Sequence, residues 1–386
     1  MARILFVQPS IQPPGGGNGV AAWMLQAIVP EHDITLLTWR TVDFDAVNRF
    51  FGTSLRRQDA SLRQVSGAWR LALDHLPSPM ALMKSAVLTQ TAARLPDTFD
   101  LAISANNEGD FGRPNIQYIH YPTFTRPRPL ADMRWYHHPA FLLDIYYSVP
   151  DRMMRLSRER MLAARTLANS DWTGRAFTAR HGGPAETLYP PIATSFPDVP
   201  WSERENAFVA IGRISPEKKY GRILEIIAGV RRAHPGVRLH VVGSREPGWR
   251  CRRMIRRLRQ YPWVTLHLDL SRDELVRLIT SSRYGIHAME DEHFGMGPAE
   301  LVAGGCLTWV HNSGGQVEIL RGDPRFTYGT ADEAIAKISG MMSDSDSQSE
   351  VRASLREHMR IYSVDRFQDR IRAVVSEVLA ATRPPS

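Results

Sequence analysis

The stretch YGIHAMEDEHFGMGPAELVAGGCLTWVHN, residues 284–312, places two short apolar runs on either side of a glycine-rich bend. The runs YGIHAME (284–290) and LTWVHN (307–312) have the length and the aromatic and β-branched content of buried strands. Between them, Pro298 suits the first turn of a helix that runs through Val302. Strand, helix and strand in this order predict neighbouring parallel strands with a helical crossover.

The same alternation continues in both directions and predicts an α/β fold with two Rossmann-like domains. Further strands are expected at 3–8, 33–39, 99–105, 116–121, 166–170, 186–190, 207–214, 237–244 and 264–270. A proline-rich, mostly polar segment separates the two sets. We therefore expect domains at 1–190 and 207–364, a linker at 191–206, and a C-terminal helix within 365–386 that packs back on the first domain. The two domains would face each other across a cleft.

Composition indicates a soluble globular protein. The chain has 386 residues, 43% hydrophobic and 23% charged, and no apolar run long enough to span a bilayer. Its first residues have no signal-peptide core and are better explained as a strand. Cys251 and Cys306 are the only cysteines, which favours a reducing compartment. We expect a cytoplasmic protein, with peripheral contact at the inner face of the membrane left open.

The net charge of +8 raises the question of an anionic partner. Basic residues are densest in WRCRRMIRRLRQY, residues 249–261. Three interpretations stay open: a solvated helix face, a surface for anionic membrane or ligand, and a nucleic-acid site. Nucleic acid is disfavoured because no helix-turn-helix, RNP or zinc-finger spacing accompanies the charge.

Two carboxylates flank the glycine-rich bend. Phe294, Gly295 and Met296 would form a tight loop at a helix start, where backbone N–H groups bind phosphate. Glu292 and Glu300, on either side, would accept hydrogen bonds from sugar or ribose hydroxyls. This combination predicts a nucleotide-sugar site. The alternatives are a helix-dipole role for Glu300 and a solvent-exposed loop acid for Glu292.

Two other segments also follow predicted strands. In GRISPEKKYGR (212–222), Arg213 and Lys218 would bind a diphosphate, unless Lys218 or Lys219 pairs with Glu217 at the surface. PPGGGNGVAAW (13–23) would bring backbone N–H groups to an anion at the start of a helix from about Val20, or would be a flexible turn. It has neither dinucleotide-binding nor P-loop spacing.

The order of glycine loop, GR-x4-K, E-x7-E and SGG turn resembles the retaining glycosyltransferases of family 4, which have the GT-B fold. The blocks EHFGMGPAELVAGG, WVHNSGG and YIHYPTF are similar to the branch that adds α-1,2-linked mannose from GDP-mannose to dolichol-linked oligosaccharide. No membrane anchor is predicted at the start of this chain, so we expect a soluble or peripheral relative.

The resemblance implies roles for individual residues. Catalytic roles fall to His120, Arg213, Lys218 and Glu292, and donor-binding roles to Gly16, Gly17, Gly212, Gly243, Ser244, Phe294, Gly295, Met296 and Glu300. For His120 the alternative is a hydrogen-bonded histidine at a strand end.

The implied reaction is transfer of a hexose, mannose from GDP-mannose, to a hydroxyl of a glycan or lipid-linked acceptor with retention of configuration. We expect no metal or other cofactor, because no D-x-D sits at a plausible strand end and the one at Asp344 and Asp346 lies in a polar segment. A UDP-sugar transferase, a nucleotide-sugar epimerase, a non-catalytic nucleotide- or glycan-binding protein and a membrane-associated scaffold remain alternatives.

Overall fold

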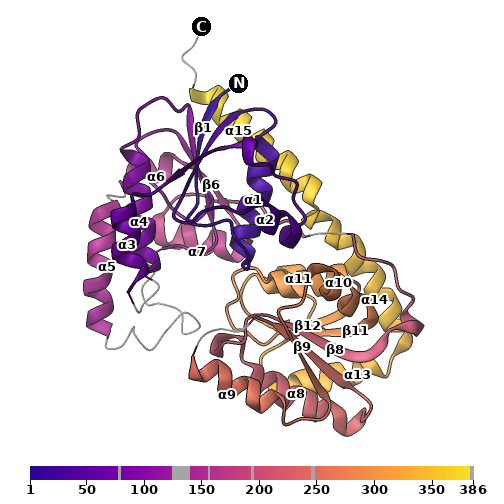
Figure 1. The fold of residues 1–386 in the computed structure, drawn as a ribbon. Helices are drawn as coiled ribbons and strands as arrows, with labels where there is room; N and C mark the ends of the chain where they lie inside the picture. Colours follow the sequence, from indigo (N-terminus) through magenta and orange to yellow (C-terminus); the bar gives the residue numbers. More distant parts are fainter. Residues whose placement is uncertain (77–79, 124–139, 155–156, 193–194, 245–247, 383–386) are drawn as a thin grey trace. The chain divides into compact units, whose positions relative to one another are not determined.

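The computed structural model describes residues 1–76, 80–123, 140–154, 157–192, 195–244 and 248–382. The chain forms two compact units, one of Met1–Pro191 with Val364–Ser386 and the other of Ile192–Ser363. Each unit is a parallel sheet flanked by helices (Figure 1). The predicted α/β fold with two Rossmann-like units is therefore confirmed.

The first unit contains a seven-stranded sheet in the order β3-β2-β1-β4-β5-β6-β7, parallel throughout. Its strands are β1 (Arg3–Val7), β2 (Asp33–Thr38), β3 (Ser61–Gln64), β4 (Leu101–Ser104), β5 (Asn115–Ile119), β6 (Arg165–Ala168) and β7 (Glu186–Thr187). Strand β3 was not predicted, because this half-exposed edge strand has no apolar run. The other strands overlap the predicted segments.

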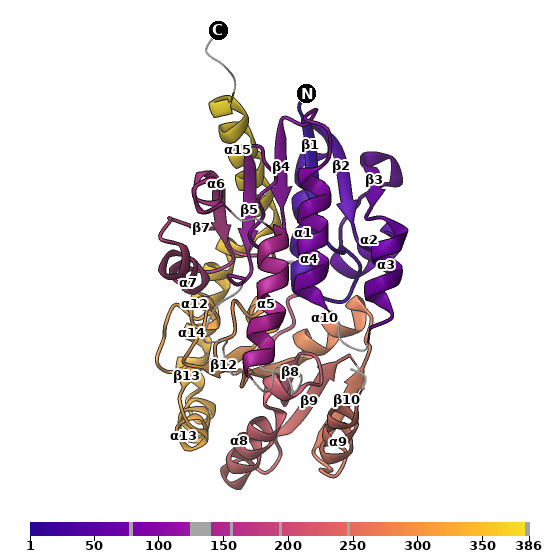
Figure 2. The ribbon, with the colours of Figure 1, turned by 90° about the vertical axis from the view of Figure 1, so that its left-hand side faces the viewer.

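Helices cover both faces of this sheet. They are α1 (Gly16–Ile28), α2 (Phe44–Phe51), α3 (Gly67–Asp74), α4 (Ala81–Ala93), α5 (Ala140–Met154), α6 (Arg158–Ala163), α7 (Asp171–His181) and α15 (Val364–Thr382). Figure 2 shows α15 alongside the strands of this sheet, and α15 also contacts α1. Phe367, Ile371 and Val375 repeat at helical spacing and are buried in that core. The last helix therefore completes the first unit.

The second unit contains a six-stranded parallel sheet in the order β10-β9-β8-β11-β12-β13. Its strands are β8 (Glu205–Ile211), β9 (Arg238–Gly243), β10 (Val264–Leu268), β11 (Ser282–Ile286), β12 (Leu307–His311) and β13 (Thr327–Tyr328). Its helices are α8 (Tyr220–Ala233), α9 (Trp249–Leu258), α10 (Arg272–Ser281), α11 (Met296–Ala303), α12 (Gln316–Ile319), α13 (Ala331–Met342) and α14 (Ser345–His358). The strand–helix–strand predicted around the glycine-rich bend is β11, α11 and β12.

The predicted linker at 191–206 differs from the structure, in which the second unit begins at Ile192. Ile192 is buried, and its N–H donates to the Tyr362 carbonyl at 2.8 Å. Arg204 is also buried and donates to the Gly304 carbonyl at 2.8 Å. The prolines keep this segment irregular, but its apolar and arginine side chains attach it to the second unit.

Both sheets have a topological switch point, where the strand order reverses. In the first sheet it lies between β1 and β4, and in the second between β8 and β11. Open parallel sheets bind ligands beyond the carboxyl ends of the strands at such points. The predicted site residues follow these strands or their immediate neighbours.

Two predictions from composition can be located in the structure. Cys251 and Cys306 are both buried free thiols. Within the described ranges, none of the helices combines the length and the apolar character needed to cross a lipid bilayer.

Candidate functional site

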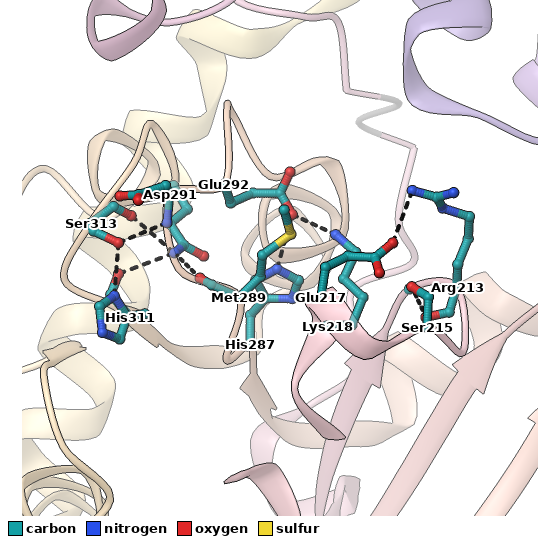
Figure 3. Close-up of polar contacts among 12 residues, drawn as sticks. Arg213, Ser215, Glu217, Lys218, His287, Met289, Asp291, Glu292, His311 and Ser313 are labelled. Carbon is teal, nitrogen blue, oxygen red and sulfur yellow. Dashed lines mark hydrogen bonds and ion pairs between the residues drawn. The ribbon is translucent and has the colours of Figure 1, made fainter. Parts of the chain in front are cut away.

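The predicted basic and acidic segments meet at the switch point of the second sheet (Figure 3). Lys218 ends a short 3-10 turn (Pro216–Lys218) after β8, and Glu292 lies in the loop after β11. Lys218 Nζ is 2.5 Å from Glu292 Oε2, and each side chain is 16% exposed. Two residues 74 positions apart in the chain thus form one largely buried ion pair.

His287, which the sequence did not single out, is the second partner of Glu292. It is the first residue after β11 and is buried. Its Nε2 lies 3.1 Å from Glu292 Oε2. Because a carboxylate can only accept, Nε2 carries the proton and donates. The His287 N–H donates to the Trp309 carbonyl at 2.8 Å, and its carbonyl accepts from Tyr328 Oη at 2.6 Å, which fixes the residue's backbone.

These contacts set the ionisation of the site. Burial alone would raise the pKa of Glu292, but the charge of Lys218 and the hydrogen bond from His287 outweigh it and hold that pKa well below its usual range. Burial lowers the pKa of His287, against the opposing effect of Glu292. At neutral pH the site therefore presents a carboxylate and a neutral imidazole beside the lysine.

The SGG turn, residues 313–315, holds the backbone of Glu292. The Gly315 N–H donates to the Glu292 carbonyl at 2.8 Å, and Ser313 Oγ accepts from the Asp291 N–H at 2.8 Å. Gly314 has a φ of +80°, and a Cβ there would lie 2.3 Å from the Glu292 carbonyl oxygen. Only glycine meets both constraints. The turn therefore fixes the loop that carries Glu292.

Arg213, predicted to share an anion with Lys218, pairs instead with Glu217 at 3.4 Å. The Arg213 side chain is 51% exposed and that of Glu217 only 7%, and Figure 3 shows Arg213 to one side of Lys218 and Glu292. The surface pair that the sequence left open for Lys218 or Lys219 is thus formed by Arg213. Half of the Arg213 side chain is therefore open to an anionic ligand, whereas the Glu217 carboxylate is buried.

Lys219 belongs to a second charged cluster, centred on Glu290. Lys219 Nζ lies 2.5 Å and an Arg222 guanidinium nitrogen 2.7 Å from Glu290 Oε1. The hydrogen bond from Lys219 lowers the pKa of Glu290, and Arg222 adds to the effect against partial burial. The consecutive lysines therefore serve different carboxylates, Glu292 and Glu290.

Helix α11 follows the glycine-rich bend and has Pro298 in its first turn, as predicted. Gly295 is its N-cap, with a φ of +104°. The N–H groups of a helix's first turn have no partner within the helix and are suited to an anion. Phe294 is buried, with its ring 5.6 Å from that of Tyr362. Only its backbone is therefore a candidate for ligand binding.

Glu300 lies beyond the first turn of α11, which contains no acidic residue, so the helix-dipole alternative is wrong. Its carboxylate pairs with Arg272 of α10, and the two side chains are 16% and 22% exposed. A ribose that bound Glu300 would have to share the carboxylate with Arg272. The ribose-binding role of Glu300 stays a prediction.

Three predicted donor-binding residues lie side by side at the ends of β8 and β9. A Cβ on Gly243 would be 2.2 Å from the Gly212 carbonyl oxygen, so the two strands can approach only with glycine there. The Ser244 carbonyl accepts the Ile214 N–H at 3.3 Å. Gly212, Gly243 and Ser244 thus form one continuous backbone surface.

In the first unit, the structure brings the glycine segment and His120 together. Helix α1 begins at Gly16, not near Val20, so Gly16 and Gly17 form its first turn rather than a free loop. A Cβ on Gly17 would lie 3.1 Å from His120 Nε2. The same nitrogen is 3.1 Å from the Ala105 carbonyl and therefore carries a proton. The strand-end hydrogen bond that the sequence left as an alternative is present.

Asn107 positions His120 and was not predicted. Its Oδ1 accepts the N–H groups of His120 at 2.7 Å and Tyr121 at 3.0 Å. Its φ is +66°, a conformation that asparagine tolerates better than most residues. The neighbouring Glu108 is buried and accepts from His181 Nε2 at 2.8 Å. The loop after β4 therefore orders the end of β5.

The predictions missed the residues that hold the candidate site residues in place. They are Asn107, His287, Glu290 and Gln316, whose buried Nε2 donates to the Met289 carbonyl at 2.7 Å. The sequence carries one signal for Asn107 and His287, because each is a polar residue that follows a strand, β4 and β11 respectively. No local pattern identifies Glu290 or Gln316, because the partners that link them to the site, Lys219 and Arg222 for Glu290 and the Met289 carbonyl for Gln316, are distant in sequence.

The D-x-D sequence has a local structural role. Asp344 is the N-cap of α14, and its carboxylate accepts the Ser347 N–H at 3.0 Å and hydroxyl at 2.6 Å. In the part of the chain that the structure describes, no group of three or more His, Cys, Asp or Glu side chains is arranged to hold a metal ion. Metal independence stays a prediction.

Comparison with known protein families finds a match within the second unit. Residues 192–360 match the family model described as glycosyl transferases group 1. The human GDP-Man:Man(3)GlcNAc(2)-PP-Dol alpha-1,2-mannosyltransferase is 27% identical over 226 residues, which cover 53% of this chain and 45% of that protein. The chain spans about half the length of the curated relatives it matches.

Solved structures share the fold over nearly the whole chain. Anabaena Alr3699/HepE in complex with UDP-glucose has a TM-score of 0.67 at 16% identity and covers 98% of this chain and 100% of its own. Sucrose-phosphate synthase from Thermosynechococcus elongatus has a TM-score of 0.72 at 13% identity, with 99% and 100% covered. At this identity the likeness shows the fold alone, and that fold is GT-B.

Proposed function

We propose, from the match of residues 192–360 to the glycosyl transferases group 1 family model, that this chain transfers a hexose from a nucleotide sugar to a hydroxyl of a glycan or lipid-linked acceptor. The donor we propose is GDP-mannose. The reaction retains the anomeric configuration and needs no metal. Mannosyltransferase relatives at modest identity support the choice of sugar.

One observation carries the proposal: Lys218, Glu292 and the start of α11 meet at the switch point of the second sheet. A nucleotide sugar needs a cation and oriented N–H groups for its diphosphate, and acceptors for its hydroxyls. These groups lie within the segment that matches the family model. Their arrangement supports a donor site in the second unit.

The proposed chemistry breaks the bond between the anomeric carbon and the diphosphate oxygen. The acceptor oxygen bonds to the same face of that carbon, and its hydroxyl proton passes to the departing diphosphate. Negative charge grows on the diphosphate, so Lys218, Arg213 and the N–H groups at the start of α11 stabilise the transition state. Glu292 orients the sugar and is not a covalent nucleophile.

Donor binding has an electrostatic requirement. Without ligand, Lys218 is neutralised by Glu292. A diphosphate that binds Lys218 must share it with Glu292 or displace the carboxylate toward the sugar hydroxyls. His287 keeps its hydrogen bond to Glu292 during this exchange and prevents the carboxylate from being left without a donor.

For His120 and the glycines at the start of α1, we keep the roles that the family resemblance implies. His120 Nε2 carries a proton, which suits a donor to a sugar hydroxyl. Gly17 leaves room beside that ring, since a Cβ there would be 3.1 Å away. Replacing Gly17 by alanine should therefore disturb His120 directly.

Thermal unfolding with GDP, UDP and ADP, each with and without magnesium, tests the donor assignment. A nucleotide at a hundred times its dissociation constant adds about 2.7 kcal/mol of stability. Stabilisation by GDP that is indifferent to magnesium is the expected result, and mannose release from GDP-mannose onto glycan acceptors is the activity to assay next. Stabilisation by UDP would change the proposed donor to a UDP-sugar and leave the proposed type of reaction unchanged. No response to any nucleotide would favour a non-catalytic binding protein.

A further inference from the structure

Helix α9 presents one face made of six arginines and a tryptophan. Trp249 is 59% exposed, whereas Cys251 and Leu258, on the opposite side of the helix, are buried. The arginines are all exposed: Arg250, Arg252, Arg253, Arg256, Arg257 and Arg259. At 3.6 residues per turn, Arg253 and Arg256 lie on either side of Trp249, and the other arginines extend the face outward. We call these seven residues the arginine face.

Folding does not account for this face. No Asp or Glu occurs between residues 247 and 268. Within the described ranges, none of the six arginines pairs with a carboxylate. Like charges three and four positions apart repel along a helix, and cations in the first turn oppose the helix dipole. Arg256 and Arg257, in the last turn, do favour the helix dipole, but the two buried side chains would hold the helix without any arginine, and the repulsion along the face is not relieved by any carboxylate of the described residues.

Trp249 favours a membrane over nucleic acid as the partner of the arginine face. Trp249 is the first residue of α9, and the Arg250 guanidinium carbon lies 5.5 Å from the centre of its ring. Tryptophan with arginine is the combination found at membrane interfaces, where the ring sits among the headgroups and the guanidinium binds phosphate. A nucleic-acid site would need this face to follow a groove or a single strand, and the motifs that do so are absent from the sequence.

Helix α9 begins near the edge of the second sheet that carries the candidate donor site. The chain reaches α9 after β9, whose carboxyl end carries Gly243 and Ser244. Trp249 therefore stands at the end of α9 that follows the candidate site's edge of the sheet. Figure 2 shows α9 on the outside of the second unit beside β10, with which it is in contact.

We propose that the arginine face of α9 docks the second unit on membranes containing anionic phospholipid. Lipid phosphates bind the arginines, and Trp249 inserts its ring at the headgroup level. Docking is peripheral and falls with ionic strength, because its main component is electrostatic.

Vesicle cosedimentation of the full chain tests this proposal. The vesicles are phosphatidylcholine alone, or phosphatidylcholine with an equal part of phosphatidylglycerol, and contain no glycan acceptor. The outcome is therefore independent of the transfer reaction. The expected result is binding to the anionic vesicles only, with loss of binding in high salt.

Matched variants locate the surface. Arg253→Gln with Arg256→Gln should weaken partitioning by about twenty-five-fold, given roughly fivefold for each basic residue near an anionic surface. Trp249→Ala should weaken it with the salt dependence unchanged. Arg232→Gln with Arg277→Gln removes equal charge from exposed positions on α8 and α10 and should bind as the unmodified protein does.

Three outcomes would overturn the proposal. They are equal binding to neutral and anionic vesicles, equal losses in the two double variants, and no vesicle binding at all. Binding of a DNA duplex without vesicle binding, lost in the Arg253 and Arg256 variant, would assign the face to nucleic acid instead. Circular dichroism of each variant checks that α9 has not unfolded.

Discussion

Lys218 Nζ lies 2.5 Å from Oε2 of Glu292, and the same oxygen accepts the hydrogen bond of His287. Lys218 and His287 therefore keep the Glu292 carboxylate ionised through Oε2, and neither of them uses Oε1. This arrangement suits a group that must remain charged and still accept a hydrogen bond from a bound sugar.

Breaking the ion pair should destabilise the second unit. Lys218→Met leaves the Glu292 carboxylate largely buried without its cation, and we expect a loss of about 3–5 kcal/mol. Urea denaturation measures the change. Lys337→Met is the matched control, because Lys337 lies 2.6 Å from Glu333 but in a more exposed pair, and it should cost at most about 1 kcal/mol. Equal losses in the two variants would contradict the assigned burial of the pair.

The same pair predicts a dependence of stability on pH. The pKa of Glu292 is well below 4.5 in the folded protein, so folding favours the charged form. This contribution is complete above the unfolded pKa and is lost as the pH falls through the folded pKa. The stability difference between the unmodified protein and Glu292→Gln should therefore shrink on acidification below about pH 4.5. A difference that stays constant down to the lowest accessible pH would show that Glu292 is not paired as described.

His287 should affect turnover without touching the substrate. His287→Ala removes a hydrogen bond to a charged group, and we expect kcat to fall by roughly tenfold to a hundredfold with KM for the donor little changed. His287→Gln keeps an N–H donor and should recover much of the loss. Steady-state kinetics with varied donor separates the two parameters. A rise in KM alone, or no recovery with glutamine, would assign His287 a different role.

The fold was predictable because buried parallel strands have short, nearly continuous apolar sequences. β8, β9 and β11 follow this pattern and were expected near their observed bounds. Short edge strands such as β3 lack it, since one side of an edge strand is not covered. The segment at 191–206 was misjudged for a related reason: its prolines indicate a linker, while its attachment depends on contacts with Tyr362 and Gly304.

The site was predictable only in part. Charged residues after strands indicated Lys218 and Glu292, because their chemistry and local spacing are visible in the sequence. Which charges pair is decided by the order of strands: β8 lies next to β11, so Lys218 meets Glu292 rather than Glu217. His287 could not be identified in advance, because its importance follows from the same long-range neighbourhood.

The SGG turn offers the sharpest test of how Glu292 is held. Gly314 and Gly322 both have positive φ, +80° and +69°, but a Cβ on Gly314 would meet the Glu292 backbone at 2.3 Å while one on Gly322 would meet nothing within 4 Å. Gly322→Ala should therefore cost only the backbone penalty, about 1–2 kcal/mol. Gly314→Ala adds a clash that must move Glu292, and it should cost more stability and most of the activity. Urea denaturation and donor turnover of the two variants make the comparison. If both lose the same stability and keep the same activity, the turn does not position Glu292, and the loop after β11 must be fixed by Gln316 instead.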